Sequence, residues 1–149
     1  KRKMTEQRQK VETEMIVRYA ETDQMGIAHH SNYPVWFEVG RTDFFKKIGF
    51  PYSEVESKGF LLPLTDMKCK FIKPAKYEDS IVIKTQISRI MHVKVCFHYD
   101  VYNKEVGTLI AAGETNHGWT DRQLNPLVIE EKFPELYKAL TCHVIKNSY

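Results

Sequence analysis

The chain has 149 residues, with 22 lysines and arginines against 19 aspartates and glutamates, a net charge of +3. This length fits one domain with its own core, and so mild a charge argues against a dedicated nucleic-acid-binding protein. No apolar run approaches the ~20 residues that a membrane span needs, so we expect no such segment. We expect one domain over residues 1–149, with residues 1–10 as a flexible terminus.

Three cysteines, Cys69, Cys96 and Cys142, stand far apart in the chain. An odd number without a Cys-x-x-Cys unit favours neither a disulfide framework nor a common zinc site. The sequence therefore predicts a protein of the reducing cytoplasm with no bound metal. No apolar segment follows the basic first residues, so we expect no secretory leader. Cys69 and Cys96 lie in predicted strands, where we expect core or sheet-face positions.

The first part of the chain predicts a strand, a loop and the start of a helix. Residues 14–20 have the composition of a strand, and residues 21–30, ETDQMGIAHH, that of a loop. Ser31 or Asn32 can cap the following helix, and Pro34 fits its first turn, where a missing N–H costs nothing.

The predicted helix carries one apolar stripe with the spacing of a buried helix face. Its members are Tyr33, Trp36, Phe37, Gly40, Phe44 and Ile48, and Phe45 widens it. We expect Gly40 to let the helix approach its neighbours closely. Gly49 fits the position after the last helical residue, and Pro51 prevents the helix from resuming. A stripe with so many large aromatic residues must be covered, most simply by a sheet.

The rest of the chain predicts consecutive strands and a last helix. The strands cover residues 61–73, 81–90, 93–102 and 108–120, and the helix begins near Pro134 and extends to about Val144. A helix enclosed by a strongly curved antiparallel sheet satisfies this order and belongs to the α+β class. Such a sheet has unpaired edge strands, and pairing with a second copy would remove an exposed edge.

The loop before the long helix holds the residues best suited to chemistry. Asp23 lies seven residues before His30, at the predicted helix start. A helix N-terminus presents unpaired backbone N–H groups and the positive end of the dipole, which can hold a developing oxyanion. A nearby carboxylate can be a nucleophile or a general base for water. Together they form a minimal acyl-transfer site, although a loop Asp is by itself most often a turn former.

Residues 18–45, RYAETDQMGIAHHSNYPVWFEVGRTDFF, resemble the signature of the 4-hydroxybenzoyl-CoA thioesterase family of hotdog-fold proteins, including its bacterial acyl-CoA thioesterase branch. The matching elements stand at unbroken spacing: Asp23 with Gly26, then Asn32-Tyr33, then Trp36-Phe37-Glu38 and Arg41. The resemblance extends more loosely over residues 12 to about 142. It implies a hotdog fold, in which a curved antiparallel sheet wraps around a long central helix.

The same resemblance implies cofactor-free hydrolysis of an acyl-CoA thioester, in a homodimer or homotetramer with active sites at subunit interfaces. Asp23 is then the catalytic carboxylate, as nucleophile or general base, and the backbone N–H of His30 binds the thioester carbonyl. The further implied substrate contacts are Gly26, Asn32, Tyr33 and Trp36.

Coenzyme A carries phosphates, so lysines and arginines are expected at the mouth of its site. Around one strand connection the candidates are Arg89, His92 and Lys94, of which we select Arg89 and Lys94; Lys70 and Lys73 lie near another connection. Each of these cations is also compatible with a solvated strand end.

Other residues have plainer interpretations. Asn32 can be a helix cap, and Tyr33, Trp36 and Phe37 can be ordinary core rather than the wall of an acyl pocket. Glu38 and Arg41 have the spacing of a helical ion pair, which we favour. His30 as a general acid is a weaker hypothesis, and so is a metal pair of His29 with His30, because adjacent residues face one ion poorly. His117 is expected to be structural.

Two alternatives to an acyl-CoA thioesterase stay open. An acyl-carrier-protein thioesterase would use the same machinery on a partner with an acidic surface. A non-catalytic acyl-binding hotdog protein would not need the carboxylate of Asp23. Dehydratases of this fold fit less well, because they rely on a histidine with an acidic partner. None of these hypotheses includes nucleic acid as a partner.

Overall fold

The computed structural model describes residues 10–144, so the expected flexible terminus, except for Lys10, lies outside the described residues. The elements, in chain order, are β1 (Val11–Ile16), the 3-10 helix η1 (Tyr19–Glu21), α2 (Asn32–Lys47), α3 (Tyr52–Ser57), β2 (Leu64–Phe71), β3 (Ser80–Met91), β4 (Lys94–Asn103), β5 (Leu109–Gly118), α4 (Ile129–Lys132) and α5 (Pro134–Thr141).

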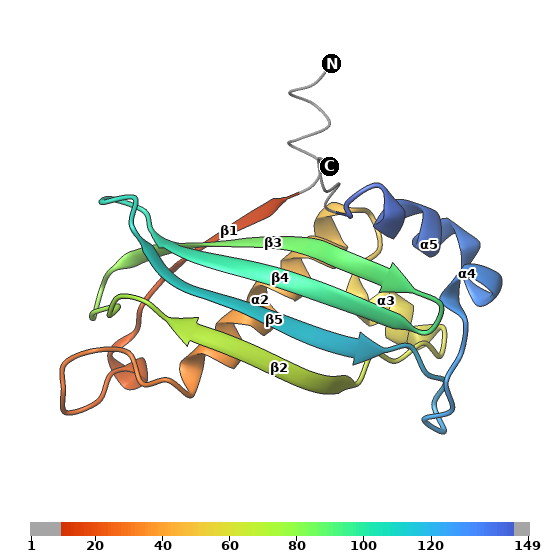
Figure 1. Cartoon of the computed structure of the whole chain (residues 1–149), viewed down its shortest axis with the longest axis horizontal. Helices are drawn as coiled ribbons and strands as arrows, with labels where there is room; N and C mark the ends of the chain where they lie inside the picture. The colour runs from red at the N-terminus through yellow and green to blue at the C-terminus, as the bar shows by residue number, and fades with distance from the viewer. Residues whose placement is uncertain (1–9, 145–149) are drawn as a thin grey trace, which may run out of the picture.

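The strands form one five-stranded antiparallel sheet in the order β1-β3-β4-β5-β2. The sheet curves over α2, which lies along its concave face, while α4 and α5 lie beyond one end of the sheet (Figure 1). This arrangement confirms the predicted α+β hotdog fold. β1 and β2 are the two edge strands, so each has one side without a partner strand within the described chain.

Helix α2 is buried along the predicted stripe. Its buried residues are Tyr33, Trp36, Phe37, Gly40, Phe44 and Phe45. The ring of Phe37 stacks on Tyr99 of β4, with centroids 4.5 Å apart. Gly40 confirms the expected close approach, because a Cβ built there would stand 2.5 Å from Thr85 Oγ1 and 2.8 Å from Ile83 Cγ2. The absence of a side chain therefore lets the helix seat against β3.

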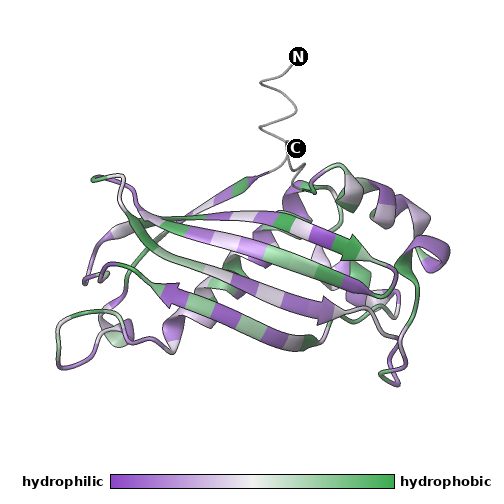
Figure 2. Cartoon of the chain, viewed as in Figure 1, coloured by the Kyte–Doolittle hydropathy of each residue, from purple (hydrophilic) through white to green (hydrophobic). Residues whose placement is uncertain are grey.

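The strands alternate between apolar and polar residues as the sequence predicts. In β4, Val95, Phe97, Tyr99 and Val101 are buried. Figure 2 shows the same alternation as purple and green bands along β2. Cys96 is buried and Cys69 is half-buried, which agrees with their expected places in the sheet. The apolar faces of the strands and the stripe of α2 together make one core.

Several boundaries differ from the prediction. The strand expected over 14–20 is displaced toward the N-terminus, to Val11–Ile16, because the chain turns into η1 before the loop. After Pro51 the chain forms a second, short helix. Pro51 is the N-cap residue of this helix, α3, which the sequence analysis missed. Val144 lies beyond α5 and forms a bridge with Ile87 instead of a helical turn.

The strands expected over 61–73 and 108–120 are shorter at both ends. Within the described residues, no helix is both long enough and apolar enough to cross a membrane.

Candidate active site

The loop between η1 and α2 is held as a narrow hairpin. Thr22 and Ala28 form an antiparallel bridge, and the backbone N–H of Asp23 donates to the carbonyl of Ile27 at 3.1 Å. Gly26 closes the tip with φ of +77°, in the left-handed region that a glycine adopts without strain. Ala28 N–H also donates to the carbonyl of Ala75, 2.8 Å away, which fixes the hairpin to the connection between β2 and β3.

The carboxylate of Asp23 is partly exposed at the edge of this hairpin. Its Oδ1 accepts the backbone N–H of Met25 at 2.8 Å. This contact is the turn-forming role that the sequence analysis weighed against catalysis. The two roles are compatible, because a carboxylate has two oxygens and several lone pairs, and one oxygen is enough for the turn.

The start of α2 follows directly. The N–H of Ser31 donates to His29 Nδ1 at 3.2 Å, and the N–H of Tyr33 donates to the carbonyl of His30 at 3.3 Å. Among the hydrogen bonds within residues 10–144, none is donated by the backbone N–H of His30. An N–H at this position is suited to an anionic oxygen of a ligand.

Asp23 and His30 line the same cavity, which has a volume of about 340 Å³. The other lining residues are Met25, Ile27, Ala28, Tyr33, Phe71, Ile72, Lys73 and Pro74. The ring of Phe71, at the end of β2, lies 4.9 Å from that of Tyr33 and 6.4 Å from that of His30. The walls are thus mainly apolar, with the carboxylate and the helix start as the polar groups.

Tyr33 is the one expected pocket aromatic that reaches this cavity. Burial raises the pKa of its phenol, and the nearby Cys69 raises it further, so the hydroxyl stays protonated at neutral pH. Trp36, also expected as a substrate contact, is fully buried and is not among the residues that line this cavity. Its indole Nε1–H donates to Glu21 Oε2 at 2.6 Å.

Gly26 and Asn32 also do not line the cavity. Gly26 shapes the tip of the hairpin. The side-chain Nδ2 of Asn32 donates to the carbonyls of Glu21 at 2.8 Å and His29 at 3.0 Å, so this residue ties the loop to the helix rather than capping its N–H groups. The sequence analysis missed Phe71, Ile72 and Pro74, because they lie at the end of β2 and just after it, far from the loop in the sequence.

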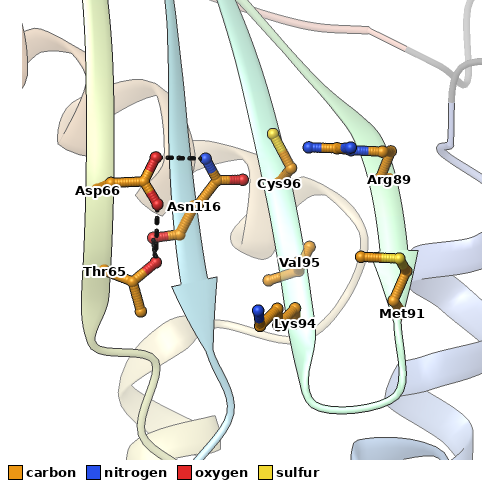
Figure 3. A pocket seen from close by; sticks show the side chains of 8 residues that line it. All are labelled: Thr65, Asp66, Arg89, Met91, Lys94, Val95, Cys96 and Asn116. Atoms are coloured by element: carbon orange, nitrogen blue, oxygen red, sulfur yellow. Dashed lines mark hydrogen bonds between the residues drawn. The ribbon is translucent and has the colours of Figure 1, made fainter.

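Arg89 and Lys94 line a different cavity, of about 220 Å³, with Asp66, Cys96 and Asn116. Figure 3 shows these side chains on neighbouring strands, with Asn116 bonded to Asp66. Within one chain this cavity is remote from Asp23. It lies at the Asp66 end of β2, whereas Phe71 of the first cavity lies about 17 Å further along the strand at ~3.4 Å per residue.

The two cavities also lie on opposite faces of the sheet. Phe97 points toward α2, where its ring contacts Phe44. Its neighbour Cys96 therefore points to the other face, because successive side chains of a strand alternate. Of the remaining cations, Lys73 lines the cavity of Asp23.

Arg41 departs from the expected ion pair with Glu38. Its Nη1 donates to the hydroxyl of Tyr99 at 3.0 Å, and residues 10–144 contain no ion pair between Glu38 and Arg41. The Tyr99 hydroxyl in turn lies 2.6 Å from Thr115 Oγ1, which lies 2.8 Å from His117 Nε2. His117 is thus part of a buried network, as a structural residue would be.

A curved antiparallel sheet over one long helix, with a cavity at the start of that helix, is the arrangement of a hotdog-fold protein. The chain belongs to the thioesterase-like superfamily, whose family model matches residues 17–140. This match is to the superfamily as a whole and does not assign the chain to the narrower 4-hydroxybenzoyl-CoA thioesterase family.

Individual relatives agree with this membership. YneP of Bacillus subtilis, whose name carries a provisional acyl-CoA thioesterase assignment, is 40% identical over 85% of this chain and 91% of its own length. A DHNA-CoA thioesterase from Staphylococcus aureus superposes with a TM-score of 0.84 at 32% identity, over 89% of each chain. The chloroplastic acyl-acyl carrier protein thioesterase ATL3 of Arabidopsis thaliana is 27% identical over 91% of this chain and 70% of its own length. The chain is accordingly an enzyme of the thioesterase class.

Proposed function

We propose that the chain is a cytoplasmic enzyme that hydrolyses an acyl-CoA thioester to the free acid and CoA. Asp23 is the reacting carboxylate, and the start of α2 is the oxyanion site. The observation that carries this proposal is the shared cavity: Asp23 and His30 line it together, and the His30 N–H donates to no other group in the described chain. Membership in the thioesterase-like superfamily supports the reaction class.

Two routes use these groups. In one, Asp23 takes a proton from water, whose oxygen bonds to the thioester carbonyl carbon; the C–S bond then breaks and CoA leaves as a thiolate. In the other, a carboxylate oxygen of Asp23 bonds to that carbon, the C–S bond breaks, and water hydrolyses the mixed anhydride. Both routes place negative charge on the carbonyl oxygen, which the N–H of His30 stabilises.

The side chains that line the cavity indicate the polarity and shape of the acyl group that fits it. Ile27, Tyr33, Phe71 and Ile72 offer apolar surface, and no lysine or arginine other than Lys73 lines the cavity within the described residues. An uncharged acyl chain or ring therefore fits best. The rings of Tyr33 and Phe71 meet edge to face and form an aromatic wall against which a flat group can pack, so aromatic thioesters such as 4-hydroxybenzoyl-CoA are the first substrates to test.

The phosphates of CoA are assigned to Arg89 and Lys94, which requires a second subunit. Antiparallel pairing of two β2 edges about a two-fold axis places the Asp66 end of one β2 beside the Phe71 end of the other. The end of the partner's sheet that carries Arg89 and Lys94 then lies at the same end of the combined sheet as the cavity of Asp23, and because the two cavities open on opposite faces, bound CoA would pass over the strand ends. The exposed apolar side chains on β2, Leu64 (51% exposed) and Phe71 (53%), support an interface along this edge.

Mixed oligomers test this assembly. One population carries Asp23→Asn, the other Arg89→Ala with Lys94→Ala, and the two are unfolded together and refolded. If the site spans two subunits, a mixed dimer contains one intact site and activity at low CoA-thioester concentration rises well above that of either parent. If each chain holds a whole site, mixing gives no gain. A lack of gain in verified mixed dimers contradicts the shared site.

An acyl carrier protein is the second candidate substrate carrier. Lys70, Lys73 and Lys76 stand exposed around the connection that borders the cavity, where an acidic carrier could dock. Relatives named as acyl-acyl carrier protein thioesterases support testing it. Thiol release from matched acyl-CoA and acyl-carrier-protein thioesters separates the two carriers by kcat/KM.

Asp23→Asn tests the mechanism itself. The amide keeps the shape and an acceptor oxygen for Met25 N–H, but it loses the charge and the basicity. Because general-base assistance alone is worth ~10²–10⁴-fold, kcat on the best thioester should fall at least about a hundredfold. Thermal stability should change little.

Asp121→Asn is the matched control, since Asp121 Oδ1 accepts the N–H of Gln123, two residues on, at 2.9 Å, far from the cavity in the sequence. A stable and fully active Asp23→Asn enzyme would refute the mechanism. A wild-type protein that binds thioesters but releases no thiol would favour a non-catalytic acyl-binding role.

A further inference from the structure

Glu21 is a buried carboxylate that the proposed chemistry does not use. It stands at the end of η1, two residues before Asp23, with 3% of its surface exposed, and it lines no part of the cavity. Buried carboxylates are rare unless they are paired, because desolvation opposes the charge. This one is fully engaged by donors from two elements, which calls for a role beyond packing.

The side chain of Glu21 joins η1 to α2. Its Oε1 accepts the backbone N–H of Arg18 at 2.8 Å and Arg18 Nε at 3.3 Å, while its Oε2 accepts the indole Nε1–H of Trp36 at 2.6 Å. Burial raises the pKa of Glu21, but the donors from Arg18 and Trp36 outweigh burial and keep that pKa below its usual value. The carboxylate is therefore ionised at neutral pH, and its bonds are charge-assisted.

The backbone of the same residue closes the loop. The carbonyl of Glu21 accepts the N–H of His29 and the side-chain Nδ2 of Asn32, each at 2.8 Å. Glu21 is thus bonded at once to the last part of the loop, to the first turn of α2 and, through Trp36, to the second turn. Along the chain, Asp23 lies within the loop that these bonds close, and His30 directly follows it.

We propose that Glu21 is a positioning residue, which fixes Asp23 relative to the helix start by bonding Trp36 with its carboxylate and His29 and Asn32 with its carbonyl. This inference rests on the proposed function of Asp23 and His30. The reasoning is geometric: a reacting carboxylate and an oxyanion donor on separate elements act together only if their separation is fixed, and a displacement of ~1 Å can cost about a hundredfold in rate.

The experiment measures Glu21→Gln in two backgrounds, wild type and Asp23→Asn. In the wild-type background, loss of the charge-assisted bonds should lower kcat about tenfold or more, with KM changed much less, because the groups outside the loop still bind substrate. In the Asp23→Asn background, the same substitution should change the residual rate less than about twofold, since there is no carboxylate left to position. Glu14→Gln, at an exposed position of β1, is the matched control.

A spectroscopic signal reports the bond directly. The chain has two tryptophans, so its NMR spectrum contains two indole N–H resonances. The variant Trp36→Phe identifies the resonance from Trp36. Glu21→Gln should move that resonance upfield, because the acceptor is no longer charged. Asn32→Ala, which removes a half-buried link to the carbonyl of Glu21, is the second variant and should show the same selective loss of kcat if Glu21→Gln does not fold.

The outcomes separate the inference from the proposed function. Unchanged kcat in folded Glu21→Gln, with Asp23→Asn inactive, overturns the positioning role alone. Equal losses in both backgrounds also overturn it, because they indicate a lower fraction of folded enzyme. A wild-type protein without thioesterase activity, or an active Asp23→Asn enzyme, overturns the proposed mechanism and the positioning role with it.

Discussion

The buried network around His117 predicts a specific loss of stability in mild acid. His117 is 1% exposed, and its Nδ1 lies 3.1 Å from the carbonyl of Leu62, which can only accept. Nδ1 therefore carries the proton, and Nε2 accepts from the Thr115 hydroxyl. That hydroxyl accepts from Tyr99, whose oxygen accepts from Arg41. The donor and acceptor of each hydrogen bond in this network are therefore set by a neutral imidazole at His117.

Burial lowers the pKa of His117 to about 4, and the nearby Arg41 acts in the same direction; the ordinary value is 6.5. Because the folded-state pKa is depressed, the unfolded chain binds this proton more readily. The stabilisation is present above pH 6.5 and is lost as the pH falls toward 4. Between pH 7.5 and pH 5.0 the loss amounts to about 2 kcal/mol of unfolding free energy.

Urea unfolding at fixed protein concentration measures this loss, and His117→Gln isolates it. Glutamine offers an acceptor to Thr115 but does not titrate, so subtracting the two profiles removes the contributions of all other groups. One of these is His98, whose pKa is raised by its bond to Asp100 and which therefore has the opposite pH dependence. A difference between the profiles that stays constant from pH 7.5 to pH 5.0 would refute the reasoning.

Two further predictions concern packing and assembly. Gly40→Leu should lower the free energy of unfolding by about 1–3 kcal/mol, because the new side chain overpacks Thr85 and Ile83, and Val39→Leu on the exposed face should not. Helix propensity alone predicts a gain of up to ~1 kcal/mol for Gly40→Leu, so the sign of the change in urea decides between the two. Sedimentation equilibrium should give a mass of at least twice the 17.5 kDa of one chain, and a monomer at micromolar concentration would contradict the shared site.

The central architecture could be predicted because its signals are local. The stripe of α2 recurs at helical spacing, and the strand alternation is continuous over whole elements, so both survive in any tertiary context. Gly40 was predictable because a glycine lowers helix propensity, so its place inside a strong apolar stripe indicates close packing against another element. The loop with Asp23 and the helix start are adjacent in the sequence, which is why their shared cavity could be expected.

The remaining features depend on partners far apart in the chain. Arg41 bonds Tyr99, 58 residues away, and no pattern within α2 favours that over the neighbouring Glu38. Trp36 has the same apolar-stripe position as the core residues, but its N–H required an acceptor, which Glu21 supplies from another element. Helix α3 buries one residue, Val55, and so short a helix leaves no periodic signal.

Backbone groups hold the loop of the site in place, whereas side chains line its cavity, and this difference affects how the substrate preference can change. The hairpin that carries Asp23 is held by backbone bonds, from Asp23 to Ile27 and from Ala28 to Ala75. The proposed oxyanion donor, the N–H of His30, is a backbone group as well. The cavity walls, in contrast, are side chains such as Met25 and Ile72, both exposed and free of these bonds. Substitutions in the walls can therefore alter acyl preference while the proposed reacting groups keep their places.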